Sequence, residues 1–299
     1  MTSWKQASKT HKALQETDRL RQDARGHQDA AHRVSPVPEP PAYRIDRFEN
    51  AEDEVHRLKA QAEVVFRREV QLLRQLGLPE SGRVLDVGCG PGFVTAGIAA
   101  QNPSLSVFGV ELDTTALGVA QGRVTYVHGS ALSLPFRTDS FDFIWARYVL
   151  RHIPEVAKVV TEMLRVVRPG GRIAVIDMDD QTLLVDPVPE GFAEVRQARH
   201  QTYLRRQAHP HIGRMLPRLV REAGGREIHT VPFPVTAQEL GPEAFARIVL
   251  HVIAQDIDED LLSRQDAGHC RDAIAAWGQR SDVFGLVVPL AVSASKLVR

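Results

Sequence analysis

Three glycines at alternate positions follow an apolar run in Val84-Leu85-Asp86-Val87-Gly88-Cys89-Gly90-Pro91-Gly92. Glycines with this spacing let the backbone turn tightly and let a ligand approach without interference from Cβ atoms. A dinucleotide fingerprint would place its third glycine at position 93, which is Phe93, and no Gly-Lys-Ser/Thr follows that would make a nucleotide phosphate loop. The loop therefore predicts a ligand site of another kind.

Two carboxylates accompany the loop. Asp86 comes just before the glycines, and Glu111 ends the next apolar run, nineteen residues past Gly92. A carboxylate beneath the loop would repel a pyrophosphate but suits S-adenosylmethionine, which carries a sulfonium and an ammonium and no phosphate. Glu111 can accept hydrogen bonds from both hydroxyls of a ribose. The alternative is a glycine-rich turn beside an incidental acid, but the loop, Asp86 and Glu111 agree in favouring the cofactor.

These residues resemble the class I S-adenosylmethionine-dependent methyltransferases, particularly the group of ubiquinone and menaquinone biosynthesis methyltransferases and bacterial small-molecule methyltransferases. The matching segments cover most of residues 83–177 and are Val84–Gly92, Gly109–Asp113, Gly129–Phe136, Phe141–Pro154 and Arg168–Val175. The resemblance implies an α/β fold with a Rossmann-like seven-stranded sheet, whose last strand is antiparallel, and with helical lid insertions. It also implies methyl transfer from S-adenosylmethionine.

The resemblance further implies which residues contact the cofactor. Asp86, Gly88 and Gly90 would line its methionine half, while Glu111 would hold the ribose and Leu112 would pack on the adenine. The other expected cofactor-binding residues are Cys89, Ser130, Ala131 and Arg147. The family usually has an acid where Ser130 stands, which bonds the adenine amino group. A neutral hydroxyl makes a weaker hydrogen bond than a carboxylate, so cofactor affinity would depend more on Glu111.

In the family, the segment Ala146–Pro154 borders the methyl group. It does not match the Asn/Asp-Pro-Pro-Tyr/Phe loop of amino-group methyltransferases that act on nucleic acids and proteins. His152 is a candidate general base because an imidazole titrates near neutral pH. The alternative is a histidine that packs against or caps the helix starting near Pro154.

Asp179 is the second candidate catalytic base. It belongs to the acidic cluster Asp177–Asp180, which follows the fifth expected strand. The same cluster could bind a cationic substrate, hold a metal with a histidine, or form a solvated acidic turn. We expect no metal, because no second carboxylate cluster with suitable spacing is found.

Apolar runs alternate with helical segments after residue 82, which predicts a parallel sheet with helices on both faces. The expected strands are Arg83–Val87, Ser106–Glu111, Val124–His128, Phe141–Trp145 and Arg172–Asp177, and the expected helices are Thr95–Ala100, Asp113–Gln121 and Glu155–Val167. Ligands bind beyond the carboxyl ends of such strands. The last expected strand, Phe284–Ala294, contains Pro289, which cannot donate to a ladder and predicts a bulge or local disruption.

The chain divides into an arm and a domain. Residues 1–42 form a polar, basic arm with a proline-rich linker, and residues 1–33 contain too few large apolar side chains to offset their ordering entropy. We expect this arm to be mobile or loosely helical, or to bind a partner. Residues 43–299 form the methyltransferase domain, with an N-terminal helical segment at 50–76 and lid insertions at about 180–210 and 236–280.

The composition limits the class of acceptor. The 37 basic and 37 acidic residues balance, which argues against a surface that tracks nucleic-acid phosphates. Two cysteines are too few for a disulfide framework, and the longest apolar run is too short to span a membrane.

We therefore expect a cytoplasmic enzyme that methylates an oxygen, nitrogen or carbon of a small molecule in secondary or cofactor metabolism, with its oligomeric state left open. Two alternatives stay open. One is a cofactor-binding protein without transferase activity, and the other is an RNA or protein methyltransferase recruited through the basic arm.

Overall fold

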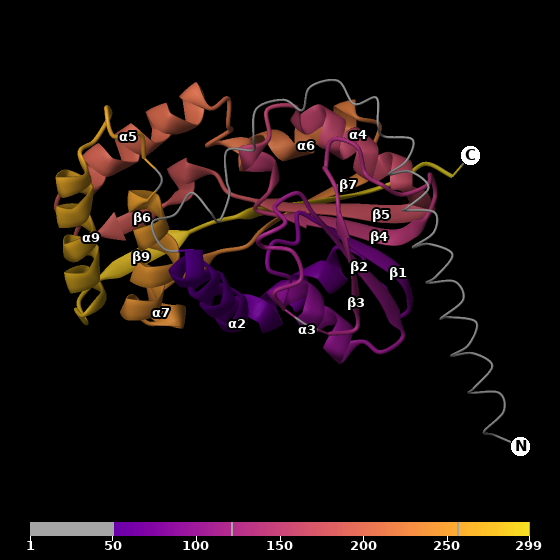
Figure 1. Ribbon diagram of the computed structural model, residues 1–299, viewed down its shortest axis with the longest axis horizontal. Helices are drawn as coiled ribbons and strands as arrows, with labels where there is room; N and C mark the ends of the chain where they lie inside the picture. Colours follow the sequence, from indigo (N-terminus) through magenta and orange to yellow (C-terminus); the bar gives the residue numbers. More distant parts are fainter. Residues whose placement is uncertain (1–50, 121, 256, 299) are drawn as a thin grey trace, which may run out of the picture. The chain divides into compact units, whose positions relative to one another are not determined.

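The computed structural model describes residues 51–120, 122–255 and 257–298 (Figure 1). Residues 51–134 and 138–298, within these ranges, belong to one compact unit. The expected arm and linker at 1–42 and the first residues of the expected domain lie outside the described residues. Within the described residues, no helix combines the length and the apolar character needed to cross a membrane.

A seven-stranded sheet forms the centre of the unit, with the strand order β3-β2-β1-β4-β5-β10-β7. Its strands are β1 (Gly82–Val87), β2 (Leu105–Glu111), β3 (Val124–His128), β4 (Phe141–Arg147), β5 (Val167–Asp177), β7 (Arg226–Pro232) and β10 (Leu290–Ser295). The first five pair in parallel, and β10 runs antiparallel to both of its neighbours, β5 and β7. The predicted seven-stranded α/β sheet with an antiparallel last strand is confirmed.

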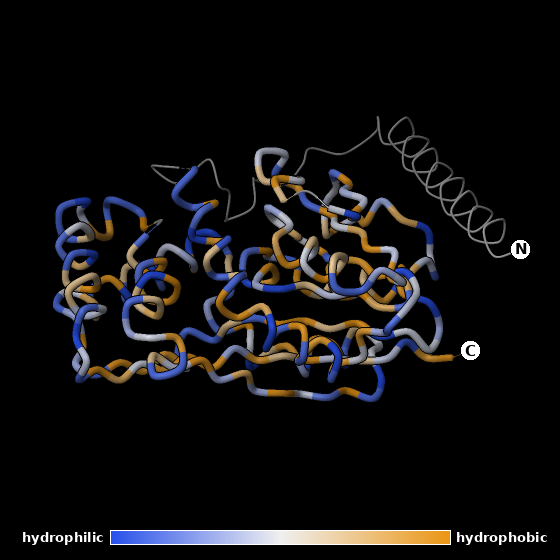
Figure 2. The backbone as a smooth tube through the Cα atoms, turned by 90° about the horizontal axis from the view of Figure 1, so that it is seen from below, coloured by the Kyte–Doolittle hydropathy of each residue, from blue (hydrophilic) through white to orange (hydrophobic). Residues whose placement is uncertain are grey.

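Helices cover both faces of this sheet. The longer ones are α2 (Ala51–Gln75), α3 (Phe93–Gln101), α4 (Val156–Val166), α5 (Phe192–Arg205), α6 (Ile212–Glu222) and α9 (Arg264–Gly278). In Figure 1, α4 and α6 lie on one face, and α3 lies on the other face beside α2. With helices on both faces, the central strands are apolar on both sides, and in Figure 2 hydrophobic stretches follow the strands.

Turns, rather than the expected helix, follow β2. Residues 113–120 of the expected helix Asp113–Gln121 contain a turn at 114–118 and no helix, so that prediction is wrong for the described part. The Asp113 carboxylate accepts hydrogen bonds from the backbone N–H and the hydroxyl of Thr115, at 2.9 and 2.6 Å. Such local bonds compete with helix formation. Gly118, with a φ of 74°, then turns the chain in the left-handed region.

The last expected strand is divided at Pro289, which confirms the predicted disruption. Its first half is β9 (Phe284–Val287), which lies in a separate three-stranded sheet between β6 (Leu184–Asp186) and β8 (Val235–Thr236). Its second half is β10 of the main sheet. Since β6 lies in the insertion expected at about 180–210 and β8 borders the one expected at about 236–280, one apolar run connects these two segments with the core sheet.

Short helical turns complete the insertions and the loops around the site. They are η2 (Leu150–His152), η3 (Asp180–Thr182), α7 (Ala237–Leu240), α8 (Pro242–Phe245), η4 (Ala246–Leu250) and η5 (His251–Ala254). Helix α5 packs on η5, and η4 contacts α2. These contacts bring the two insertions and the N-terminal helix together beyond the carboxyl ends of β1, β4 and β5.

Candidate functional site

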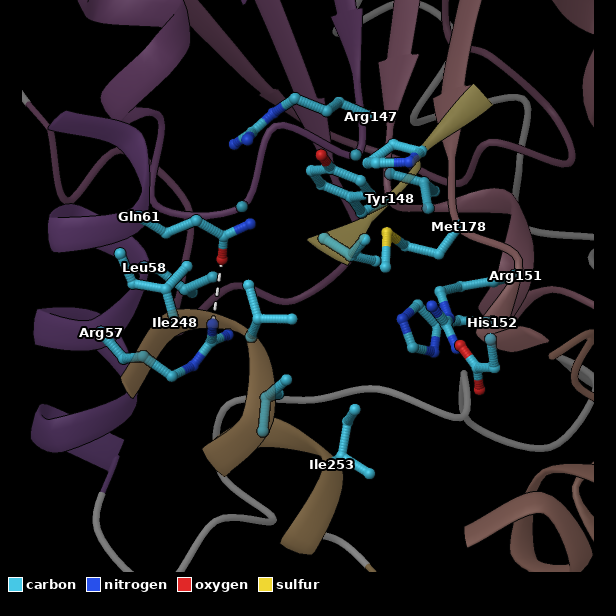
Figure 3. Close-up of a pocket in the computed structure, with 18 of the residues that line it drawn as sticks. Arg57, Leu58, Gln61, Arg147, Tyr148, Arg151, His152, Met178, Ile248 and Ile253 are labelled. Atoms are coloured by element: carbon cyan, nitrogen blue, oxygen red, sulfur yellow. Dashed lines mark hydrogen bonds and ion pairs between the residues drawn. The ribbon is translucent and has the colours of Figure 1, made fainter. Parts of the chain in front are cut away.

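A cavity of about 600 Å³ opens beyond the carboxyl ends of β1, β2 and β4. The glycine loop and Glu111 line it on one side, α2, α5, η4 and η5 line it on the other, and the segment 147–153 lines it between them. Figure 3 shows Leu58 and Ile248 on one side of this cavity and Tyr148 and His152 on the other. The cavity is therefore where the parallel-sheet rule predicts a ligand.

The backbone of the glycine loop requires glycine. Gly88 has a φ of 71°, and a Cβ atom there would lie 2.5 Å from Cγ2 of Val149. Gly90 has a φ of 54°, and a Cβ atom there would meet nothing within 4 Å. Gly90 also lines the cavity, so a ligand can approach its backbone closely.

Asp86 lies beneath this loop and is 4% exposed. Its Oδ2 accepts a hydrogen bond of 2.6 Å from the hydroxyl of Thr95. Burial raises the pKa of Asp86 to about 7 despite that bond. A positive charge placed nearby would stabilise the ionised carboxylate, which fits a cationic ligand.

Glu111 shapes the loop and lines the cavity. Its Oε2 accepts from the N–H of Gly90 at 2.9 Å, and its Oε1 accepts from the N–H groups of Leu112 and Asp113 at 2.7 and 2.9 Å. An ionised carboxylate offers about four acceptor positions, so three hydrogen bonds leave capacity for a ligand hydroxyl. With Asp86 below and Glu111 beside the loop, the residues present fit S-adenosylmethionine.

The other expected cofactor residues divide into two groups. Cys89 and Arg147 line the cavity, and burial raises the pKa of the Cys89 thiol. Leu112, Ser130 and Ala131 are not among the lining residues. The Ser130 hydroxyl instead accepts from the N–H of Leu132 at 3.2 Å. The cofactor contacts of these three residues stay a prediction.

His152 ends η2 and lines the cavity, with its ring centroid 5.9 Å from that of Tyr203. Burial, followed by the charges of Arg151, Arg199 and Arg206, holds the pKa of His152 well below 6.5. The imidazole is therefore neutral near pH 7, as a general base must be, but it is a weaker base than an ordinary histidine.

Asp179 differs from His152 in position and charge. It is 1% exposed and is not among the residues that line the cavity. Arg214 donates to both of its oxygens, and Nδ1 of His211 lies 3.2 Å from Oδ1. Burial acts to raise the pKa of Asp179, but the hydrogen bonds from Arg214 and the Gln181 N–H, together with the charges of Arg214 and His211, outweigh it and lower the pKa. The two expected bases are thus not brought together, and Asp179 is engaged in an ion pair.

Sequence reasoning missed Glu69, on α2. Its side chain is fully buried, and both of its oxygens accept from Nη1 of Arg147 at 3.1 Å. The ion pair joins α2 to the carboxyl end of β4. A signal was present, because Glu69 interrupts the apolar stripe of α2 between Val65 and Leu72.

Arginines on α5 were missed as well. Arg196 and Arg199 line the cavity from this helix, one turn apart. Nη1 of Arg199 donates to the carbonyl of Val252 at 2.5 Å, and Nη2 donates to the hydroxyl of Tyr203 at 2.7 Å. In the part of the chain that the structure describes, no group of three or more His, Cys, Asp or Glu side chains could hold a metal ion.

Residues 85–175 match the family model described as a methyltransferase domain. Over 150 residues, the chain is 37% identical to "Methyltransferase GfsG" of Streptomyces halstedii, covering 46% of this chain and 54% of that protein. It is 31% identical to a "Demethylmenaquinone methyltransferase" of Anoxybacillus flavithermus, covering 46% of this chain and 62% of that protein. The matches thus span less than two thirds of these relatives.

Two solved structures share the fold. A "putative methyltransferase from antibiotic biosynthesis pathway" of Anabaena variabilis is 18% identical, with a TM-score of 0.56, and the match covers 76% of this chain and 96% of that one. A phosphoethanolamine N-methyltransferase 2 of Haemonchus contortus, in complex with S-adenosyl-L-methionine, is 21% identical, with a TM-score of 0.51 and coverages of 80% and 56%. The predicted resemblance to class I S-adenosylmethionine-dependent methyltransferases is thus confirmed: residues 85–175 match a methyltransferase domain, and the described residues share the fold of solved methyltransferases.

Proposed function

We propose that this chain transfers the methyl group of S-adenosylmethionine to an oxygen, nitrogen or carbon of a small-molecule acceptor in secondary or cofactor metabolism. The observation that carries the proposal is that one continuous cavity runs from the glycine loop to the apolar side chains of α2, η4 and η5. Its volume of about 600 Å³ lies within the range of small-molecule sites, about 300–1,000 Å³. The demethylmenaquinone methyltransferases among the relatives, named for a small acceptor, support the same class.

Three residues of the chain hold the cofactor in this proposal. Gly90 presents open backbone, Glu111 accepts from the ribose hydroxyls, and Asp86 supplies negative charge beneath the loop. S-adenosylmethionine, when bound, supplies a methyl group on a sulfonium, from which an acceptor nucleophile displaces S-adenosylhomocysteine. The carboxylates stabilise the cationic form of the cofactor.

The acceptor would lie against the other residues of the cavity. Leu58, Ile248 and Ile253 line it with apolar surface, which excludes water and orients an apolar molecule. A neutral ring nitrogen of His152 accepts the proton that a hydroxyl or acidic carbon loses as its bond to the methyl group forms. An acceptor amine that arrives neutral would need only alignment.

Turnover tests this function directly. The purified full chain is incubated with methyl-labelled S-adenosylmethionine and a cell extract, and the label is followed into small-molecule, RNA and protein fractions. We expect label in the small-molecule fraction and stoichiometric S-adenosylhomocysteine. Label in RNA or protein would instead support a macromolecular acceptor. Cofactor binding by calorimetry without S-adenosylhomocysteine formation in any fraction would support a binding protein and contradict the proposal.

A further inference from the structure

Three arginines line the cavity where α5 and η2 meet. They are Arg151, Arg196 and Arg199, and the only carboxylate that lines this region among the described residues is that of Asp180. Asp180 pairs with Arg151, whose Nη2 lies 2.8 Å from Oδ1. Asp177, buried behind η2, accepts from the backbone N–H of Arg151 at 3.1 Å and adds a second negative charge near Arg151. The three guanidinium groups still exceed the nearby carboxylates, so the region carries a net positive charge.

The other cavity-lining arginines are already neutralised. Arg57 pairs with Glu54 at 2.6 Å, and Arg147 pairs with Glu69 at 3.1 Å. The excess positive charge thus belongs to α5 and η2 and is not shared by the whole cavity.

Among these arginines, Arg199 combines unused hydrogen-bonding capacity with a position beside the apolar residues of η5. Its Nη atoms donate to neutral oxygens of Val252 and Tyr203, and none of the ion pairs among the described residues includes it. Its Nε is buried and has no hydrogen-bond partner within the described part of the chain. Arg199 as a whole is half-buried, and the Asp180 carboxylate on which its charge acts is already paired with Arg151, so an anion beside Arg199 would be favoured.

Apolar side chains lie near this charge. Arg199 donates to η5 at Val252, and Val252 lines the cavity with Ile248 and Ile253. In Figure 3, Ile248 and Ile253 lie across the cavity from Arg151 and His152. A ligand that reaches Arg199 therefore meets positive charge on one side and apolar surface on the other.

We propose that the acceptor is an organic anion with an apolar body, whose negative group lies against Arg199. The apolar body packs on Ile248, Val252 and Ile253. Its identity as the methyl acceptor rests on the proposed function, whereas the anion site itself does not. The guanidinium can form two charge-assisted hydrogen bonds to an ionised group, which gives both affinity and orientation.

Two dyes with the same aromatic body test the anion site. The first, 1-anilinonaphthalene-8-sulfonate, carries a negative charge, and N-phenyl-1-naphthylamine does not. Both are titrated by fluorescence into the full chain saturated with S-adenosylhomocysteine. Losing a charge-assisted hydrogen bond costs about tenfold in affinity, so Arg199→Gln should weaken the sulfonate by at least that factor and the neutral dye by less than about twofold.

The controls separate charge from folding. Arg199→Lys keeps the charge and should retain most of the sulfonate affinity. Arg205 lies on the same helix but on the surface beside Asp260, so Arg205→Gln should change the affinity for neither dye. Circular dichroism checks that each variant is folded. Equal losses for both dyes, an unaffected sulfonate, or no saturable sulfonate binding to the wild-type chain would overturn the proposal.

The same proteins distinguish the two proposals. Calorimetric affinity for S-adenosylhomocysteine and turnover report on the methyltransferase function, and dye affinity reports on the anion site. If turnover is absent while the affinity for the sulfonate dye depends on Arg199, the anion site stands and the proposed function fails. If turnover is found with uncharged acceptors only, and Arg199→Gln leaves the affinity for the sulfonate dye unchanged, the proposed function stands and the anion site fails.

Discussion

The two sides of the cavity differ in charge and in how the chain builds them. On the glycine-loop side, the carboxylates of Glu111 and Asp113 line the cavity and Asp86 lies beneath it. On the α5 side, guanidinium groups dominate, led by Arg199. An acidic site suits a cationic cofactor and a basic site suits an anionic acceptor, so the charge of each side would favour one ligand and disfavour the other.

The difference also concerns what each side is made of. The loop side presents backbone N–H groups held by one carboxylate, and these groups lie within a few residues of a strand end. The α5 side presents long side chains from elements far apart in the sequence. Between the two sides lie His152 and the Glu69–Arg147 ion pair. The following experiments test whether each side acts as its charge indicates.

The largest expected effect concerns His152, between the two sides. If its neutral ring accepts the acceptor's proton, His152→Ala should lower turnover by about 10²–10⁴-fold while the affinity for S-adenosylhomocysteine stays unchanged. Steady-state kinetics and calorimetry measure the two quantities. His229→Ala, at an exposed position of β7, is the matched control and should leave turnover unchanged.

A loss of turnover below threefold for His152→Ala would assign that residue a packing role. The pH profile adds a second test, because the pKa of His152 is held well below 6.5 by burial and by Arg151, Arg199 and Arg206. The imidazole stays neutral down to that lowered pKa. Turnover limited by His152 should therefore persist at mildly acidic pH and fall only as the pH approaches the lowered pKa of His152, well below 6.5.

The next effect concerns the ion pair that joins α2 to β4. Glu69→Gln would leave the largely buried Arg147 charge without its carboxylate, and we expect the free energy of unfolding to fall by about 3 kcal/mol. Urea denaturation measures it. Glu63→Gln, which removes an exposed partner of Lys59 on the same helix, should cost less than about 0.5 kcal/mol.

A double variant tests whether the pair or the packing matters. Glu69→Gln combined with Arg147→Met removes both charges and should recover part of the stability lost by Glu69→Gln alone. If the double variant is less stable than the sum of the two single losses, the buried charge is not the cause. The ion pair would then have no special part in joining the two sides of the cavity.

The glycine-loop side and the α5 side also differ in how far they could be predicted from the sequence. The glycine-loop side was predicted because Asp86, Gly88 and Gly90 are contiguous and Glu111 ends the adjacent strand. The α5 side was not predicted, because its contacts join residues far apart in the sequence. Arg199 donates a hydrogen bond to Val252, 53 residues away, and Glu69 pairs with Arg147, 78 residues away. Such pairs depend on how insertions fold over the sheet, which local periodicity does not specify.

The segment 113–120 was mispredicted for a local reason, and Asp179, whose catalytic role stays a prediction, has a local partner as well. Asp179 stands at a strand end, where sites are expected, but Arg214 from α6 neutralises it. The helical pattern after Asp113 was outweighed by the hydrogen bonds that this residue makes to Thr115. In both cases a polar side chain found a nearer partner than the sequence pattern suggested.

A smaller effect tests the acidic side. Glu111→Ala should weaken S-adenosylhomocysteine binding by at least about tenfold, because one charge-assisted hydrogen bond to the ribose contributes about 1.5–3 kcal/mol. Calorimetry measures the affinity. The sulfonate dye should bind this variant as it binds the wild type, since Glu111 belongs to the other side of the cavity. Unchanged cofactor affinity would contradict the ribose assignment, and a parallel loss for the dye would contradict the division into two sides.

The smallest effect is a pH dependence that Asp86 imposes on the acidic side. Burial raises its pKa to about 7, so the carboxyl is mostly protonated below that pH and mostly ionised above it. A cationic ligand favours the ionised form, so affinity for S-adenosylmethionine should rise by about fourfold from about pH 6.5 to about pH 8. The neutral analogue 5′-methylthioadenosine lacks both positive charges and should bind with little pH dependence. If the affinities for the two ligands change equally with pH, Asp86 does not recognise the charge of the cofactor. Glu111 would then be the only one of these two carboxylates with a part in cofactor binding.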